Sequence, residues 1–166
     1  MNIVVFGAGA IGSLFGGILS KQNNVVLIGR KEHSDAINKK GLKIRGLTKL
    51  DAEISAFEKL EGIDIIPDLI VLSVKSYDTL EAAKKIKKIV REKTVVMSLQ
   101  NGLDNVEKIK KFIDIKKIVV CITTNGAVFS KPGIITHTGV GKTTMGKIID
   151  KDNNDIEKIV KIRNKL

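Results

Sequence analysis

The chain has few cysteines, prolines and aromatic residues, and these shortages exclude several classes of protein. It contains one cysteine, two prolines and no tryptophan among 166 residues. A single thiol, Cys121, excludes an intramolecular disulfide, and its position in the apolar stretch IVVCITT predicts a buried strand residue rather than a nucleophile. His33 and His137 lie far apart in the sequence, so no metal site is predicted. We expect a cytoplasmic location.

The chain is also short of acidic residues relative to basic ones. It has 29 lysines and arginines against 18 acidic residues, which gives a formal net charge of +11. Nucleic-acid binding is one interpretation of such a charge. However, the lysines alternate with apolar and acidic residues in segments such as EAAKKIKKIVREK, which is typical of solvated helix faces, and aromatic residues make up only 4%. We therefore expect no nucleic-acid partner, and a basic domain suits an anionic ligand with several phosphates.

A charged leader and an uninterrupted apolar run are both missing from the start of the chain. The first lysine is Lys21, whereas a secretory signal begins with positive charge. The first nineteen residues contain five glycines, and each glycine weakens a helix by about 1 kcal/mol relative to alanine. A membrane-spanning helix is therefore excluded here, and we expect no membrane association.

These glycines fall between a predicted strand and a predicted helix. Residues 3–6 are β-branched or aromatic, as in a buried strand, and apolar residues within 14–19 recur at helical spacing. Between them the sequence reads G-x-G-x-x-G, the fingerprint of a dinucleotide-binding turn. Gly7 would allow the tight turn, Gly9 would admit a pyrophosphate close to the backbone, and Gly12 would let the helix pack on the strand. The alternative is a glycine-rich turn that binds nothing.

The rest of the chain alternates between apolar strands and amphipathic helices. Buried strands are predicted at residues 25–28, 69–74, 94–99 and 118–123, and helices at 32–40, 79–92 and 104–112, with Asp78 or Thr79 and then Asp104 as caps. Edge strands are predicted at 42–45 and 52–56 around a turn at Gly46, a hairpin at 127–129 and 134–138 with His137 as an exposed strand residue, and a last helix at 156–166. This order predicts one domain over 1–166: a Rossmann-type, doubly wound α/β fold whose sheet is mostly parallel, with a small antiparallel addition.

The residues after the second predicted strand indicate which dinucleotide binds. NAD-binding domains usually carry an acidic residue here, which accepts the ribose 2′-hydroxyl. This chain has Gly29 and Arg30 instead. The planar guanidinium of an arginine can donate two hydrogen bonds to a 2′-phosphate, and Lys31 would add a second positive charge. Glu32 is the alternative acidic residue, but it lies beyond the strand end beside two cations. The sequence therefore favours NADP over NAD, unless Arg30 simply begins a polar surface helix.

Six stretches in succession carry a resemblance to a known family. They are GAGAIGSLFGG at 7–17, IGR at 28–30, VKSYDT at 74–79, QNG at 100–102, TTNGA at 123–127 and GVGKTTMG at 139–146. In order and spacing they resemble the N-terminal, NADP-binding domain of the ketopantoate reductase (2-dehydropantoate 2-reductase) family. The resemblance covers essentially the whole chain.

This resemblance implies a role for ten residues. The glycine turn would hold the pyrophosphate, Arg30 and Lys75 the adenosine 2′-phosphate, and Asn101 and the Ala127 backbone the nicotinamide side. The position of Lys75 at the carboxyl end of a central strand supports its role independently. The implied cofactor-binding residues are Gly7, Ala8, Gly9, Ala10, Ile11, Gly12, Arg30, Lys75, Asn101 and Ala127.

The resemblance also implies a reaction that needs residues from elsewhere. Family members reduce ketopantoate to pantoate with hydride from NADPH, on the way to coenzyme A, and a lysine of a second, helical domain acts as general acid. No lysine of this chain matches that residue, so we expect the chain to be a cofactor-binding half without the helical C-terminal domain and without catalytic residues. A reductase of another 2-keto acid and a stand-alone NADP(H)-binding or sensing module are the alternatives. Pairing as a homodimer or with a separate catalytic domain is also expected.

Overall fold

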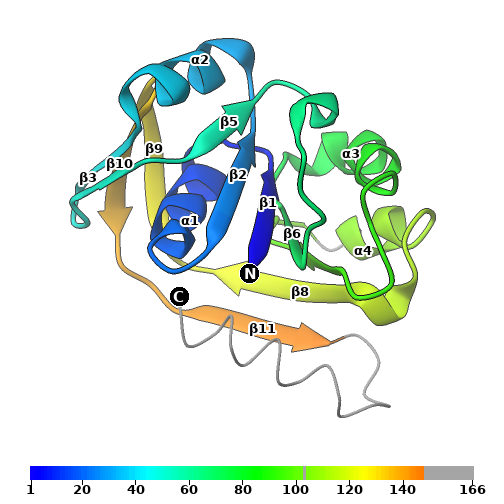
Figure 1. Cartoon of the computed structure of the whole chain (residues 1–166). Coiled ribbons are helices and arrows are strands. Elements are labelled where there is room, and N and C mark those ends of the chain that lie inside the picture. Colours follow the sequence, from blue (N-terminus) through cyan, green and yellow to red (C-terminus); the bar gives the residue numbers. More distant parts are fainter. Residues whose placement is uncertain (103, 148–166) are drawn as a thin grey trace.

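A computed structural model describes residues 1–102 and 104–147, which form two β-sheets and their covering helices (Figure 1). The strands of the larger sheet are β1 (Asn2–Phe6), β2 (Asn24–Ile28), β5 (Ser55–Phe57), β6 (Leu69–Leu72), β7 (Val95–Ser98), β8 (Ile118–Thr123) and β11 (Thr143–Lys147). Those of the smaller sheet are β3 (Leu42–Gly46), β4 (Leu50–Ala52), β9 (Gly126–Lys131) and β10 (Ile134–Gly139). The helices are α1 (Ala10–Ser20), α2 (Lys31–Lys40), α3 (Thr79–Ile86) and α4 (Asn105–Ile109), with 3₁₀ turns at Leu60–Gly62, Ser76–Asp78 and Ile115–Lys117.

The larger sheet is the predicted doubly wound, parallel core. Its strand order is β11-β8-β7-β6-β1-β2-β5, and every neighbouring pair is parallel except β11 with β8. All residues of β6 and β7 are buried, as expected for strands with a helical or sheet layer on both faces. The prediction of a mostly parallel α/β sheet is confirmed.

The two faces of this sheet are covered by different layers. Val4 of β1 packs in the cluster that holds α3 and α4, whereas Ile3 and Val5 pack in the cluster that holds α1. Figure 1 shows α1 between the larger sheet and the strands β3, β9 and β10. Glycines make this close packing possible, because a Cβ at Gly16 would come within 2.5 Å of Leu27, and one at Gly17 within 2.5 Å of Ile44.

The smaller sheet contains the predicted hairpin and extends it. Its order is β4-β3-β10-β9, with β9 and β10 antiparallel and joined by a turn at Gly133, where φ is +76°. β10 also pairs with β3 in parallel, which adds the β3–β4 pair to the hairpin. The antiparallel addition is therefore a second sheet that covers the outer side of α1.

The predicted strand at 52–56 is wrong, because the chain changes sheets within it. Ala52 ends β4 in the smaller sheet, and Ser55–Phe57 forms β5, parallel to β2 at the edge of the larger sheet. Asn38 of α2 holds β5 in place, since its side chain donates to the Ala56 carbonyl at 2.7 Å and accepts from the Ala56 N–H at 2.9 Å. The alternating pattern of a single edge strand conceals this crossing.

β11 is a strand that the sequence pattern does not predict. It runs antiparallel to β8, from Thr143 opposite Thr123 to Lys147 opposite Val119. Its residues, TTMGK, include no apolar run, because the strand lies at a sheet edge and is only partly buried.

Helices α3 and α4 begin within one residue of their predicted starts but are shorter than predicted. α3 ends at Ile86 rather than near residue 92, and α4 ends at Ile109 rather than near 112. Asp78 and Asp104 are the N-cap residues of α3 and α4, as predicted, but their side chains make no capping hydrogen bond. The Thr79 hydroxyl donates to Asn105 instead, at 2.9 Å.

Cys121 and His137, the two strand residues whose exposure was predicted, are both buried in the structure. Cys121 is buried, and burial raises the pKa of its thiol to about 11, which fits the predicted inert strand thiol. His137 is only 5% exposed, so the prediction of an exposed histidine is wrong. Both ring nitrogens have partners: Nδ1 is 2.8 Å from the hydroxyl of Thr48, which lies between β3 and β4, and Nε2 is 2.9 Å from the Gly139 carbonyl. The helix predicted at 156–166 lies outside the described residues.

Candidate dinucleotide-binding site

The candidate residues all follow the carboxyl ends of parallel strands. β1, β2, β6, β7 and β8 run in the same direction, so the loops after them meet at one edge of the sheet. The connections from β1 lead to β2 on one side and eventually to β6 on the other, which makes the gap between β1 and β6 the topological switch point. Open α/β sheets bind their ligands at such a point.

The glycine turn lies at this switch point, and two of its glycines are required by space. Gly7 has a φ of +112°, and a Cβ there would come within 2.6 Å of the Val74 nitrogen. A Cβ at Gly12 would come within 2.3 Å of the Gly7 carbonyl oxygen, so the first turn of α1 can only approach the turn without a side chain. The Ser73 hydroxyl donates to the same carbonyl at 2.9 Å and ties the end of β6 to the turn.

Gly9 differs from its neighbours because its open side faces no protein atom. A Cβ at Gly9 would meet nothing within 4 Å in the described structure, and Gly9 is the N-cap of α1 without a side-chain cap. The first N–H groups of a helix have no intrahelical acceptor, and the helix dipole gives this end a partial positive charge. The Gly9 N–H itself donates to the Gly7 carbonyl at 2.7 Å, so the donors for an anion are those of the first turn of α1. An exposed backbone beside these donors is what a pyrophosphate needs, so the turn fits a dinucleotide.

Arg30 lies at the end of β2 and begins α2. It is the N-cap residue of α2, and its carbonyl accepts from the N–H groups of His33 and Ser34 at 3.0 Å each. Its guanidinium is exposed and has no hydrogen bond or ion pair within residues 1–102 and 104–147. Lys31 is already paired with Asp35 at 2.6 Å. Arg30 is therefore the cation that is free to bind a phosphate at this strand end.

Lys75 lies on the other side of the glycine turn, after β6. It precedes the 3₁₀ turn Ser76–Asp78, is exposed, and makes no side-chain contact with a partner in the described part of the chain. β2 and β6 both pair with β1, so Arg30 and Lys75 follow strands about 10 Å apart. One phosphate could bind both cations only if both long side chains turned toward each other in front of β1.

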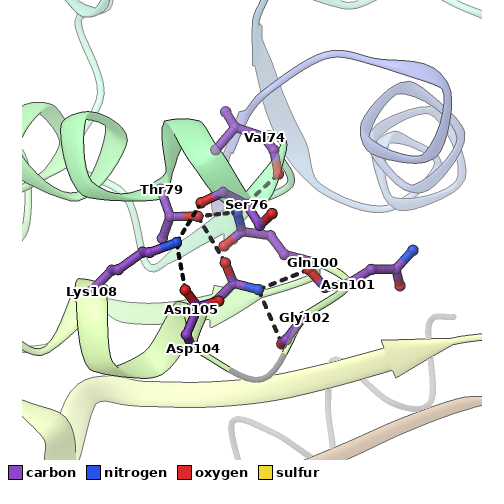
Figure 2. Close-up of polar contacts among 9 residues, drawn as sticks. All are labelled: Val74, Ser76, Thr79, Gln100, Asn101, Gly102, Asp104, Asn105 and Lys108. Atoms are coloured by element: carbon purple, nitrogen blue, oxygen red, sulfur yellow. Dashed lines mark hydrogen bonds and ion pairs between the residues drawn. The ribbon is translucent and has the colours of Figure 1, made fainter.

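A network of amides and hydroxyls fixes the loops after β6 and β7 (Figure 2). The Gln100 amide donates to the Val74 carbonyl at 2.9 Å and to the Thr79 hydroxyl at 2.8 Å. Thr79 donates in turn to Asn105, and Asn105 donates to the carbonyls of Asn101 and Gly102 at 3.0 and 3.2 Å. The loops on which Lys75 and Asn101 lie are thus held together by polar bonds that are buried at Thr79 and Asn105 and partly buried elsewhere.

The network reaches the surface through Lys108. Its ammonium donates to the Ser76 carbonyl at 3.0 Å and pairs with Asp104 at 2.7 Å, and this pairing lowers the pKa of the Asp104 carboxyl. Asn101 is at the rim: its backbone carbonyl belongs to the network, whereas its side chain is exposed and points away from the other residues in Figure 2. The amide of Asn101 is free to contact a ligand at this edge.

Ala127 lies after the loop that leaves β8. It is the second residue of β9 and pairs with His137 of β10. The preceding loop is fixed by Asn125, which donates to the Thr123 hydroxyl at 2.9 Å and accepts from the Gly141 N–H at 3.1 Å. These bonds join the start of β9 to the start of β11 beside the site.

Each of the ten predicted residues thus belongs to the carboxyl edge or the loops that leave it. The residues that hold this edge together are missed by the sequence analysis: Ser73, Gln100, Asn105, Lys108 and Asn125. The sequence predicted the helix starts at Asp78 and Asp104. It could not predict the bonds of the network, because they join residues that are 21 to 32 positions apart and no local pattern indicates them.

Within the described residues, no group of three histidine, cysteine, aspartate or glutamate side chains is placed to hold a metal ion. None of the helices described is both long enough and apolar enough to cross a membrane.

The sheet order and the glycine turn at its switch point define the class of Rossmann-type α/β domains. Within this class, the chain belongs to the ketopantoate reductase PanE/ApbA family, which it matches over residues 3–150. It is 45% identical over 165 residues to the 2-dehydropantoate 2-reductase of Pyrococcus abyssi, an alignment that covers 99% of this chain and 53% of that protein. The chain therefore spans about half the length of the curated relatives it matches.

Solved structures support the same fold. The crystal structure of 2-dehydropantoate 2-reductase from Geobacter metallireducens matches with a TM-score of 0.89 and 25% identity, covering 99% of this chain and 55% of that one. The ternary structure of D-mandelate dehydrogenase with NADH and anilino(oxo)acetate matches with a TM-score of 0.88 and 26% identity, covering 99% and 54%.

Proposed function

We propose that this chain is the NADPH-binding half of a 2-dehydropantoate 2-reductase. The single observation that carries the proposal is the carboxyl edge, where an open glycine turn lies between two exposed cations, Arg30 and Lys75, that have no partner among the residues described. The names of its relatives supply the substrate, a 2-keto acid. Bound NADPH would supply the hydride that reduces the ketone.

Each candidate residue has a distinct role in this proposal. The N–H groups at the start of α1 would bind the pyrophosphate, and the absence of a side chain at Gly9 leaves room for it. Arg30 and Lys75 would bind the 2′-phosphate of the adenosine. Asn101 and the backbone of Ala127 would orient the nicotinamide end, since both follow strands on the other side of the switch point from β2.

The cofactor assignment is tested by titrating the chain with NADPH and NADH. Arg30→Ala should weaken NADPH binding by about 1.5–3 kcal/mol, the range for a hydrogen bond to a charged group, and should leave NADH binding nearly unchanged. Lys21→Ala, which removes the same charge just after the far end of α1, is the matched control and should change neither affinity appreciably. Equal losses of NADPH and NADH affinity in Arg30→Ala would remove Arg30 from the 2′-phosphate.

A second candidate is an NADH-dependent reductase of another 2-keto acid. It is favoured by the likeness to D-mandelate dehydrogenase, whose structure contains NADH and anilino(oxo)acetate. In that case Glu32, in the first turn of α2, would accept the ribose 2′-hydroxyl. Glu32→Gln would then weaken NADH binding, whereas our proposal expects no such loss.

The reaction itself is proposed for a longer protein than this chain. No lysine here matches the family's general acid, and acid catalysis contributes about 10²–10⁴-fold to a rate. We therefore expect negligible reduction of ketopantoate by the 166-residue chain in an assay that follows NADPH absorbance. Rapid turnover would show that a proton donor is present among these residues.

A further inference from the structure

His33 is a buried histidine whose two ring nitrogens connect three parts of the fold. It lies three residues after Arg30 in α2 and is only 2% exposed. Nε2 is 3.0 Å from the hydroxyl of Ser13 in α1, and Nδ1 is 2.9 Å from the backbone nitrogen of Gly133 in the β9–β10 turn. The ring also packs against Phe129 of β9, with centroids 4.7 Å apart.

These bonds define the protonation of the ring. The Gly133 N–H can only donate, so Nδ1 must be the acceptor, and the single proton of a neutral imidazole is then on Nε2. Burial lowers the pKa of His33 to about 4, which keeps the ring neutral near pH 7. Nε2–H therefore donates to the Ser13 hydroxyl.

Through this bond His33 connects the two anion-binding elements of the candidate site. Ser13 belongs to the first turn of α1, and its N–H donates to the carbonyl of Gly9, the open glycine, at 2.9 Å. At the other end, the backbone N–H of His33 donates to the carbonyl of Arg30. The glycine turn and the arginine are thus joined by a short buried path from Gly9 through Ser13 and His33 to Arg30.

We propose that His33 is a positioning residue for cofactor selectivity, which sets the distance between the pyrophosphate cradle at Gly9 and the Arg30 guanidinium through its bond to Ser13. The 2′-phosphate and the pyrophosphate belong to the same adenosine moiety, so Arg30 and the glycine turn can bind them together only within a limited range of separations. This inference rests on the proposed function, because it needs NADPH to bind at this edge. His33 contacts neither cofactor nor substrate in this proposal.

Two substitutions of His33 separate its two bonds. The amide nitrogen of a glutamine reaches about as far from the backbone as Nε2 and can still donate to Ser13. The carbonyl oxygen of an asparagine lies near the position of Nδ1, so this shorter side chain can accept from Gly133 but does not reach Ser13. We expect His33→Gln to keep the preference for NADPH over NADH. We expect His33→Asn to reduce that preference about tenfold, since a charge-assisted hydrogen bond weakens when its donor is displaced.

Ser13→Ala removes the same Ser13–His33 hydrogen bond by changing its other partner. Because alanine also has a higher helix propensity than serine, this variant replaces His33→Asn if that one folds poorly. It should lower the NADPH preference by a similar factor, with NADH affinity within about twofold of the wild-type value. His137→Gln is the matched control: this histidine is also buried with two bonded ring nitrogens, but its partners Thr48 and Gly139 lie in or beside the smaller sheet. It should lower the melting temperature and leave the cofactor ratio unchanged.

The readout is the ratio of the two dissociation constants, measured for each folded variant by fluorescence titration. A ratio that falls in His33→Asn and Ser13→Ala but not in His33→Gln supports the proposal. Unchanged ratios, equal losses for both cofactors, or a loss in His33→Gln as well would overturn it. A wild-type chain without preference for NADPH would instead overturn the proposed function, which is seen before any variant is made.

Discussion

The two sides of the switch point are built in opposite ways. After β1, the site consists of backbone: glycines admit a close approach at Gly7 and Gly12 and leave Gly9 open. After β6 and β7, it consists of side chains that satisfy one another, with Gln100 and Asn105 at the centre of the network. We therefore expect the glycine turn to be sensitive to substitutions that add a side chain, and the network to be sensitive to substitutions that remove a polar group.

Under the proposed function, this difference has a chemical reason. A pyrophosphate needs several backbone donors within hydrogen-bonding distance, and a side chain at Gly9 would occupy its place. The nicotinamide side would need a few polar groups, such as the Asn101 amide, in fixed positions, and the partly buried network would hold their loops in place. The same sheet edge thus offers an anion cradle and a rigid platform for a polar ring.

The largest effect is expected from an atom added to the glycine side. Gly12→Ala would place a methyl group 2.3 Å from the Gly7 carbonyl oxygen and 2.5 Å from the Ser73 hydroxyl. Because backbone must move to admit it, we expect a loss of about 3 kcal/mol in the free energy of unfolding, measured by urea denaturation. Gly146→Ala is the control, since nothing lies within 4 Å of its Cβ position. Equal stability of the two variants would contradict the crowding at Gly12.

The next effect is expected from an amide removed from the network side. Asn105→Leu keeps the branching of the side chain but removes the acceptor of the Thr79 hydroxyl and the donor to the carbonyls of Asn101 and Gly102. We expect a loss of about 2–3 kcal/mol in unfolding free energy, because the buried Thr79 hydroxyl loses its acceptor and the loop after β7 loses two hydrogen bonds. Asn101→Leu, whose side chain is exposed and outside the network, should lose little stability. If both variants are equally stable, the network does not hold these loops.

The two sides should also differ in how the free energy of unfolding depends on pH in mild acid. The folded pKa of His33, about 4, lies below its ordinary value of 6.5, so the unfolded chain binds a proton first as the pH falls. Stability is therefore complete above pH 6.5 and decreases between pH 6.5 and 4, by about 2 kcal/mol after allowance for partial solvation. On the network side the Asp104 pKa lies below its ordinary 3.8, outside this range. Unfolding curves of His33→Gln should lack this decrease, and an identical pH dependence in wild type and variant would refute it.

The smallest effect on stability should come from the open glycine. Gly9→Ala meets no atom and has ordinary φ, so the free energy of unfolding should change by less than about 0.5 kcal/mol. The methyl group would nevertheless occupy the space of the pyrophosphate, and both NADPH and NADH should bind at least about tenfold more weakly. Full cofactor affinity in a stable Gly9→Ala chain would show that the ligand does not approach this residue.

Local patterns explain which parts of this comparison could be predicted from the sequence. The glycine turn, the buried strands and the β9–β10 hairpin each depend on neighbouring residues, so periodicity and turn chemistry predict them. The crossing between β4 and β5 could not be predicted, because Asn38 fixes it from another element. His33 and Gly133 are 100 residues apart, and neither their bond nor the burial of His137 has a local signal.

The most direct test of the central claim is to follow the backbone amide signals of the chain by NMR during titration with NADPH. If the glycine turn binds the pyrophosphate, the signals of Gly9, Ala10 and Ile11 will shift together with that of Arg30 as the cofactor saturates. Saturation that leaves the Gly9, Ala10 and Ile11 signals unmoved, with shifts confined to other parts of the chain, would contradict the account.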